Sequence, residues 1–317
     1  MTRTNSSRCH FVAGGVAGAT SALMTSPLEV LKTRFQSSLG QVAMGRMTAV
    51  TACGQVAVLH PTPVVGLQRY IAMGQYIKHM FQVEGARAFY KGLGPTLVGI
   101  APTRAIYFCA YEKAKRSLNG VLTPHSHQVH MTAALIGGVT TATVTSPIWV
   151  VKTRLQLDAQ AANRLTFGRC LHQILMEDGS RGFYRGLSAS YAGTAETALC
   201  FVLYENMKMS LQAGKPYYST GELDFKDYII AATSSKVIAT MVCYPHEVAR
   251  TRMRQRVSPF ERQYRSFVQT ILTVWKQEGR QGLYGGMSAH LARVIPNTAI
   301  LFLTYETVVR FLNQSVS

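Results

Sequence analysis

The sequence has few acidic residues: 15 Asp and Glu stand against 33 Lys and Arg, which gives a formal net charge of +18. Such an excess predicts anionic partners, namely nucleic acid, phospholipid headgroups or charged metabolites. Charge of either sign is also scarce, because 15% of residues are charged whereas 47% are hydrophobic. Soluble domains contain about 25% charged residues, so the composition is unusual for a nucleic-acid-binding protein with a solvated, charged surface.

Several chemical signatures are missing as well. The six cysteines are scattered and include no CxxC pair, so we interpret them as single core residues and not as a disulfide framework or metal site. GxxxxGK[ST], HExxH, GxSxG and GxGxxG motifs are absent, which argues against an enzyme and leaves no catalytic residue or cofactor to predict. His125, His127 and His130 could contact a metal, but no cysteine or carboxylate lies beside them, which favours a solvated loop.

Self-comparison reveals three copies of one unit. Each copy has a proline block, then a glycine block, then a Tyr-Glu block. The proline blocks are 26–36, 146–156 and 244–254, the glycine blocks are 84–92, 178–186 and 278–286, and the Tyr-Glu blocks begin at Tyr111, Tyr204 and Tyr305. The repetition predicts three units, 1–120, 121–215 and 216–317. The first unit has about 25 extra residues, which we assign to a loop at about 38–68.

Each unit contains two candidate membrane-spanning segments. The segments 11–28 and 131–151 have no Lys, Arg, Asp or Glu, and the second approaches the roughly 20 residues that a span needs. Each of the others is interrupted by one charge: 93–111 by Arg104, 187–204 by Glu196, 228–244 by Lys236 and 287–305 by Arg293. The alternative, a soluble all-helical repeat protein, would rarely tolerate four unpaired charges in its core. We therefore predict an all-α membrane protein with six transmembrane helices.

Three of the segments contain a proline near one end, Pro27, Pro147 and Pro245. Each proline should bend its helix by removing a backbone hydrogen bond. Charged residues follow each proline, with acid and base one helical turn apart in two of the units, so opposite charges from neighbouring units should pair around a threefold axis. A positive-inside flank of solvated lysines is the alternative, but it does not explain this spacing.

The pattern P-x-[DE]-x-x-[KR]-x-[KR], three times over, resembles the mitochondrial carrier family across essentially the whole chain. The resemblance implies a pseudo-threefold bundle of six transmembrane helices with three short matrix helices, functional as a monomer in the inner mitochondrial membrane. It also implies a matrix gate in which Glu29 pairs with Lys152 and Glu247 pairs with Lys32. The family's bracing glutamines are matched by Gln36 and Gln156.

The gates depart from the family pattern at several positions. Trp149 occupies the acidic position of the second unit, so we expect Arg250 to lack its partner, and Arg254 replaces the third glutamine. For the cytoplasmic gate, the resemblance pairs Glu112 with Lys208 and Glu306 with Lys115. Glu205 would face Val309, which cannot pair with it, and Arg310 is one residue away.

Charges inside the membrane are candidates for substrate binding. Arg104, Lys236 and Arg293 with Glu196 give a positive balance that suits a polyanion such as a nucleotide. The resemblance places the family's substrate contact positions at Gly99 and Ile100, at Ala192 and Gly193, and at Arg293 and Val294. Asn297, in the same segment as Arg293, is a further predicted substrate residue. The resemblance also implies cardiolipin binding at Gly92, Gly186 and Gly286, at the starts of even-numbered helices, which attract phosphate.

The sequence around Trp149 resembles the branch of the family that holds the pyrimidine nucleotide carriers and the carriers for NAD, FAD and folate. Four further segments are similar to the pyrimidine nucleotide carriers; they are 94–108, 190–197, 249–254 and 293–300. We therefore expect exchange of pyrimidine nucleoside (deoxy)phosphates. As an isolated carboxylate, Glu196 could couple the exchange to protons. The alternatives are a carrier for NAD, FAD or folate, a basic nucleic-acid-binding repeat protein, and a carrier-fold protein that conducts protons or acts as a receptor.

Overall fold

The computed structural model describes residues 2–37, 67–121, 126–158, 165–213, 225–255, 264 and 266–316, and all of their regular structure is helical. The six long helices are α1 (Thr2–Gln36), α4 (Leu93–Leu118), α5 (His127–Leu157), α7 (Leu187–Ala213), α8 (Phe225–Arg254) and α10 (Met287–Val316). The shorter helices are α3 (Leu67–Glu84), α6 (Phe167–Asp178) and α9 (Phe267–Leu283), with 3₁₀ turns η1 (Ala86–Tyr90) and η2 (Ser180–Tyr184). The predicted all-α architecture is confirmed. The predicted loop lies outside the described residues, except that its last two positions begin α3.

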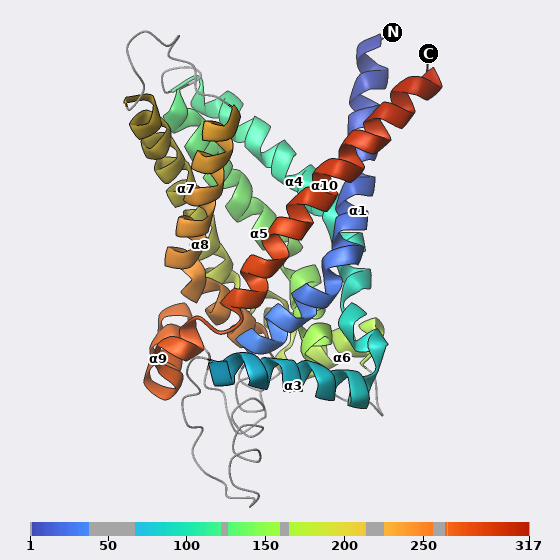
Figure 1. Cartoon of the computed structure of the whole chain (residues 1–317), viewed down its shortest axis with the longest axis vertical. Coiled ribbons are helices and arrows are strands. Elements are labelled where there is room, and N and C mark those ends of the chain that lie inside the picture. The colour runs from blue at the N-terminus through green and yellow to red at the C-terminus, as the bar shows by residue number, and fades with distance from the viewer. Residues whose placement is uncertain are drawn as a thin grey trace, which may run out of the picture.

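The long helices pack in sequence-neighbouring pairs, α4 with α5 and α7 with α8, and α10 closes the ring against α1. The first, third and fifth long helices along the chain are α1, α5 and α8, which we call the odd-numbered helices. They also contact one another. Figure 1 shows these helices converging beside α3, α6 and α9 and diverging towards the opposite end, where both termini lie. We call these the short-helix end and the terminal end. The bundle therefore has the shape of a basket. It is narrow at the short-helix end, which we call the floor, and wide at the terminal end.

Pro27, Pro147 and Pro245 lie inside α1, α5 and α8, as predicted. The residue before each proline anchors the segment that follows the short helix of the same unit. Ser26 and Ser146 donate hydrogen bonds to the carbonyl oxygens of Phe89 and Phe183, at 3.1 and 2.9 Å. In the third unit the hydroxyl of Tyr244 donates to the carbonyl of Gly285 at 2.9 Å. A larger side chain thus makes the equivalent link.

Each short helix is joined to its long helix by an ion pair that recurs in all three units. Arg34 contacts Glu84 at 2.5 Å, Arg154 contacts Asp178 at 2.7 Å, and Arg252 contacts Glu278 at 2.6 Å. Burial opposes ionisation of the first of these acids, but hydrogen bonds from Arg34 and Lys91 outweigh burial and lower the pKa of the Glu84 carboxyl. These pairs fix the short helices across the floor of the basket.

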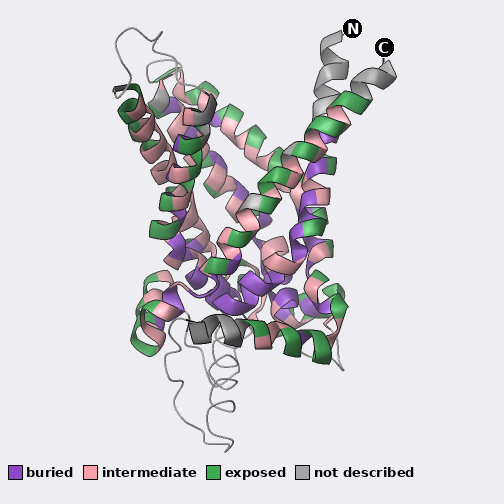
Figure 2. Ribbon diagram, in the orientation of Figure 1, coloured by how far each residue is buried: buried purple, intermediate pink, exposed green. Residues whose placement is uncertain are grey.

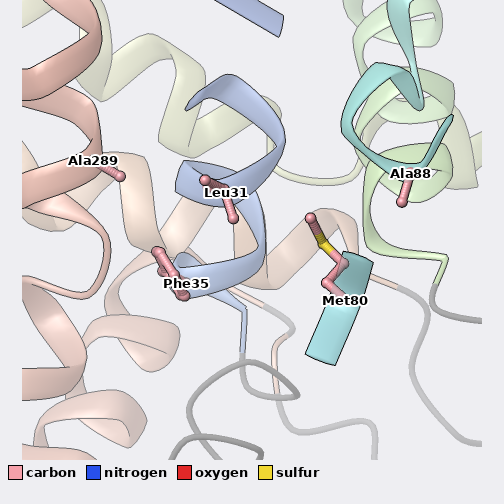
Figure 3. Packing of buried hydrophobic residues seen from close by; sticks show 5 residues of the cluster. All are labelled: Leu31, Phe35, Met80, Ala88 and Ala289. Atoms are coloured by element: carbon pink, nitrogen blue, oxygen red, sulfur yellow. The ribbon is translucent and has the colours of Figure 1, made fainter. Parts of the chain in front are cut away.

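Apolar packing completes the short-helix end. In the first unit Leu31 and Phe35 of α1 pack with Met80 of α3, Ala88 of η1 and Ala289 of α10, as Figure 3 shows. The side chains in this cluster are at most 8% exposed. Buried residues are densest where the long helices converge, and half-buried and exposed residues predominate towards the terminal end (Figure 2).

Large apolar side chains stand exposed along the long helices, among them Val98 at 69%, Leu303 at 66% and Phe108 at 58%. Such exposure is unusual for a soluble protein and is expected of a surface that faces lipid. By length and apolarity alone, one helix in the described part of the chain, Gln128–Leu157, qualifies as a membrane span. The other long helices carry charges, and several of these charges line the interior of the bundle.

A glycine with positive φ directly precedes each of the second, fourth and sixth long helices, α4, α7 and α10. These glycines are Gly92, Gly186 and Gly286, at φ 81°, 75° and 75°. An added Cβ at Gly186 would lie 3.1 Å from the carbonyl oxygen of Arg250 in the next unit, and one at Gly286 would lie 2.9 Å from that of Lys32. Backbone conformation and close approach therefore both require glycine here. Each unit rests on the next at this point.

Candidate functional site

A cavity of about 620 Å³ lies inside the bundle and is lined by residues from all six long helices. It extends from the short-helix end, at Glu29 and Lys152, to Arg104 and Tyr107 of α4. Seven basic side chains line it against three acidic ones, an excess of four positive charges. The basic residues are Lys32, Arg104, Lys152, Lys236, Arg250, Arg254 and Arg293, and the acidic residues are Glu29, Glu196 and Glu247.

Two ion pairs cross the floor of the cavity between units. Lys152 of α5 contacts Glu29 of α1, and Lys32 of α1 contacts Glu247 of α8, both at 2.5 Å. Lys32 and Lys152 are each only 7% exposed, so water screens them little. These are the two contacts that the resemblance to mitochondrial carriers predicts for the matrix gate. Together they join α1 to α5 and α8.

The expectation that Arg250 lacks a partner is wrong. Its guanidinium binds the carboxylate of Glu247, three residues earlier in the same helix. Arg250 is near enough to share this acid with Lys32, and this sharing compensates for the missing acid in the second unit. Trp149, which occupies that position, lies with its ring 4.7 Å from the Lys152 ammonium, within the range of a cation–π contact.

The glutamines predicted to brace the floor make contacts between units. The amide of Gln36 donates to the Tyr244 hydroxyl at 3.0 Å and accepts from Thr251 at 2.8 Å. Gln156 accepts from the hydroxyl of Thr33 at 3.0 Å. Arg254, at the third equivalent position, donates to the hydroxyl of Ser190 at 3.0 Å and leaves its Nε without a hydrogen-bond partner.

The interpretation of Glu196 as an isolated carboxylate is also wrong. Lys236 of α8 donates to Glu196 at 2.6 Å, and the hydroxyl of Thr240 donates at 3.0 Å. His246 lies 4.0 Å away. Two candidates that the sequence presents on different helices therefore form one ion pair, because α7 and α8 are packed side by side. A carboxylate held by a lysine favours its charged form.

Arg104 and Arg293 both line the cavity, as do Lys236, Glu196 and Gly193. Arg293 lies 3.6 Å from Glu29 and so reaches the floor network from α10. Among the described residues no ion pair is formed by Arg104, which leaves its charge available to a ligand.

The other predicted substrate contacts lie outside the cavity lining. Gly99 is buried against Ile148 and Trp149, and Ile100 packs near Gly18 of α1. Asn297 accepts hydrogen bonds from Ser21 and Thr25 of α1. Ala192 and Val294 are half-buried. These positions join helices to one another in this structure, and a substrate role for them remains a prediction.

The residues predicted for the cytoplasmic gate lie towards the terminal end. Glu306 pairs with Arg310, one turn along α10, at 2.5 Å, and both side chains are more than half exposed. In the part of the chain that the structure describes, no ion pair joins Glu112 to Lys208 or Glu306 to Lys115, and Glu205 has none. This end of the bundle is the divergent one (Figure 1), so the predicted partners are held apart.

Sequence reasoning missed several residues of the site. Tyr107, His246 and His290 line the cavity, and single aromatic or histidine residues carry no pattern that could have marked them. The acids of the short helices were also missed, although Glu84, Asp178 and Glu278 recur at the start of every glycine block and could have been paired with the recurring arginines. His130 binds the Tyr111 hydroxyl at 2.7 Å, and His125 lies outside the described residues.

Threefold repetition, long helices with exposed apolar side chains and a basic internal cavity closed at one end by ion pairs are the features of a membrane transporter of small anions. Comparison with known sequences agrees. A profile of the family described as mitochondrial carrier protein matches residues 3–122, 123–215 and 221–316. The chain belongs to the mitochondrial carrier family.

Individual relatives match over nearly the whole chain. Solute carrier family 25 member 36 of Mus musculus is 44% identical and covers 96% of this chain and 97% of its own length. Solute carrier family 25 member 33 of Mus musculus is 40% identical, with coverage of 96% and 95%. Mitochondrial carrier protein rim2 of Schizosaccharomyces pombe is 39% identical, with coverage of 96% and 89%.

Proposed function

We propose that this protein is a multi-pass carrier of the inner mitochondrial membrane that exchanges pyrimidine nucleoside (deoxy)phosphates by alternating access. The observation that carries the proposal is the charge of the cavity, an excess of four positive charges. A nucleoside triphosphate has one charge on each inner phosphate and ~1.5 to 2 on the terminal one. Cavity and ligand therefore nearly neutralise each other, which favours a phosphorylated substrate over a neutral or cationic one.

The choice of base is supported by the segments that resemble the pyrimidine nucleotide carrier branch. All four of them supply residues to the cavity lining, including Arg104, Gly193 and Arg293. A Cβ at Gly193 would lie 2.9 Å from a ring nitrogen of His246, so the absence of a side chain leaves room for that imidazole beside the cavity. The carbonyl oxygens, ring nitrogens and amino group of a pyrimidine base are groups with which the threonines and the tyrosine of this lining can form hydrogen bonds.

Alternating access requires that the two ends open in turn. In this proposal the short-helix end faces the matrix, and the pairs Glu29–Lys152 and Lys32–Glu247 form the matrix gate. Breaking them is coupled to closure at the terminal end, where Glu112 would approach Lys208 and Glu306 would approach Lys115. The substrate drives this exchange of contacts through its different affinity for the two states.

The protein works as a monomer in this proposal, because one chain encloses the whole cavity. Cardiolipin binds at Gly92, Gly186 and Gly286, where each glycine begins a long helix and leaves the first backbone N–H groups of that helix accessible to phosphate. Binding there would reinforce contacts between units. The close packing described above is an independent reason for glycine at these positions.

Homo-exchange in proteoliposomes tests the proposal. The purified protein is reconstituted with internal and external UTP, CTP or TTP and, in parallel, with purine nucleotides, NAD, FAD or folate. We expect pyrimidine nucleotides to exchange fastest, with deoxy and ribo forms both accepted. Preferential exchange of NAD, FAD or folate would instead support the alternative substrate class, and release of the native protein from membranes by salt alone would support the nucleic-acid-binding alternative.

A further inference from the structure

At the short-helix end, α1, α5 and α8 meet along three helix–helix contacts, which we call seams. The three seams are not equivalent. The seam between α1 and α5 has three side-chain links: Lys152 to Glu29, Thr33 to the Gln156 amide, and Arg34 Nε to the Gln156 carbonyl at 3.1 Å. The seam between α8 and α1 has the equivalent set: Lys32 to Glu247, Thr251 to the Gln36 amide, and Arg252 Nε to the Gln36 carbonyl at 2.6 Å. Within the described residues, no side-chain hydrogen bond or ion pair joins α5 to α8.

Two substitutions in the repeat account for this open seam. Trp149 stands where an acid would bind Arg250, and Arg254 stands where a glutamine would accept from its neighbours. The consequence is visible on both sides of the seam. Arg154 of α5, unlike Arg34 and Arg252, leaves its Nε buried without a hydrogen-bond partner, and Arg254 does the same.

Arg254 carries a buried positive charge that no ion pair neutralises in the described structure. The residue is 6% exposed. Arg250 lies one turn away on the same face of α8, and the Glu247 carboxylate is already shared by Arg250 and Lys32. On the other side Arg254 packs against Gly186, at the N-terminus of α7, where the helix dipole is positive. A buried, unpaired cation in such surroundings is costly unless an anion joins it.

We propose that a phosphate group of the transported nucleotide binds at the α5–α8 seam, between Arg250 and Arg254. Both arginines are among the residues that line the cavity. Guanidinium groups bind phosphate oxygens through paired hydrogen bonds, and two in succession suit a polyphosphate. The phosphate takes the place of the acid that is absent at Trp149, and the third seam of the floor is linked only when substrate is bound.

This inference deepens the proposed function and rests on it for the identity of the ligand. It also makes a finer statement about selectivity. A triphosphate chain reaches further from its base than a monophosphate, so it contacts the seam while the base remains higher in the cavity. Nucleoside triphosphates and diphosphates should therefore depend on Arg254, and monophosphates should depend on it much less.

Arg254→Gln tests the subsite, because glutamine is the residue that the other two units carry at this position. We expect the KM for UTP exchange to rise about ten- to hundredfold and the KM for UMP exchange to change less than threefold. Arg254→Lys, which keeps the charge, should recover part of the UTP affinity. Arg87→Gln, which removes one exposed charge from η1, is the matched control and should leave both KM values unchanged. An equal rise for UTP and UMP in Arg254→Gln would overturn the inference.

A second measurement separates this inference from the proposed function. Inorganic tripolyphosphate should raise the thermal unfolding temperature of the detergent-solubilised protein, and the rise should be lost in Arg254→Gln and kept in Arg87→Gln. If no nucleotide is exchanged by the wild type, the proposed function fails, and loss of this rise in Arg254→Gln alone would still support the anion subsite. Absence of the rise in the wild type, or its persistence in Arg254→Gln, would overturn the subsite whatever the transported substrate.

Discussion

Glu29 and Lys152 form an ion pair in the floor, and replacing one of them should lower the free energy of unfolding by a different amount from replacing the other. Their charged atoms lie 2.5 Å apart, with 18% and 9% of the side chains exposed. Breaking a buried pair from one side costs about 3–5 kcal/mol, because the other charge stays buried. After Lys152→Gln, Glu29 still has Arg293 at 3.6 Å. After Glu29→Gln, Lys152 has only the ring of Trp149, a contact of about 0.5–2 kcal/mol.

We therefore expect Glu29→Gln to lower the free energy of unfolding by about 3 kcal/mol and Lys152→Gln by roughly half as much. The double variant should lose less than the sum of the two by more than ~1 kcal/mol, because neither charge is then left unpaired. In thermal unfolding of the solubilised protein, a shift of about 2–4 °C per kcal/mol makes both differences measurable.

The exposed pair Glu306–Arg310 provides the control, since its charged atoms are also 2.5 Å apart but the side chains are 61% and 74% exposed. Glu306→Gln should cost at most about 1 kcal/mol. Equal destabilisation by Glu29→Gln and Lys152→Gln, or additive losses in the double variant, would show that the floor pair does not act as a buried, coupled unit.

Three further perturbations follow from local geometry. Gly186→Ala should destabilise the protein by about 1–3 kcal/mol, since alanine is strained at φ 75°, whereas Gly168→Ala, in open space on α6, should be neutral or stabilising in the same melting assay. The pKa of Glu84 in the folded protein lies below its ordinary value of 4.5, so the stabilisation that the ionised carboxylate contributes should be complete at neutral pH and lost as pH falls below that value. The melting temperatures of Glu84→Gln and wild type should thus converge in acid. A difference that stays constant with pH would refute this. Glu196→Gln should leave the dependence of uptake on a pH gradient unchanged, because Lys236 holds the carboxylate ionised, and a weakened dependence in liposomes would restore Glu196 as a proton carrier.

The repeat made most of the fold predictable from the sequence. Pro27, Pro147 and Pro245 occur in one register, and that register alone indicates three equivalent helices with charges at a common level. The contacts Glu29–Lys152 and Lys32–Glu247 were expected from the resemblance of this pattern to the mitochondrial carrier family. The helices extend well beyond the predicted apolar segments, as in α5, which reaches His127 and Leu157. Polar ends continue a helix when capping and tertiary contacts support them, and hydropathy does not register this.

The remaining features depend on distances that no repeat pattern encodes. Lys236 and Glu196 are 40 residues apart and belong to different units, so only the packing of α7 on α8 reveals that they pair. Arg250 was expected to be unpartnered because the pattern considers contacts between units only, and the partner is Glu247 in its own helix. Gly99 follows the family's contact position in sequence, yet Ile148 and Trp149 of the neighbouring helix occupy the space beside it.

The glycine contacts between units have a topological consequence. Gly92 rests on unit two, Gly186 on unit three and Gly286 on unit one, so the contacts run in a closed cycle. The first and last helices are neighbours, and the chain's two ends lie at the same extremity of the molecule (Figure 1). The three units therefore form a ring in which each unit packs on the next, and the chain termini lie at one of the three junctions between units. No unit makes its glycine contact by itself. A circular permutation that moved the termini to another junction would keep all three contacts.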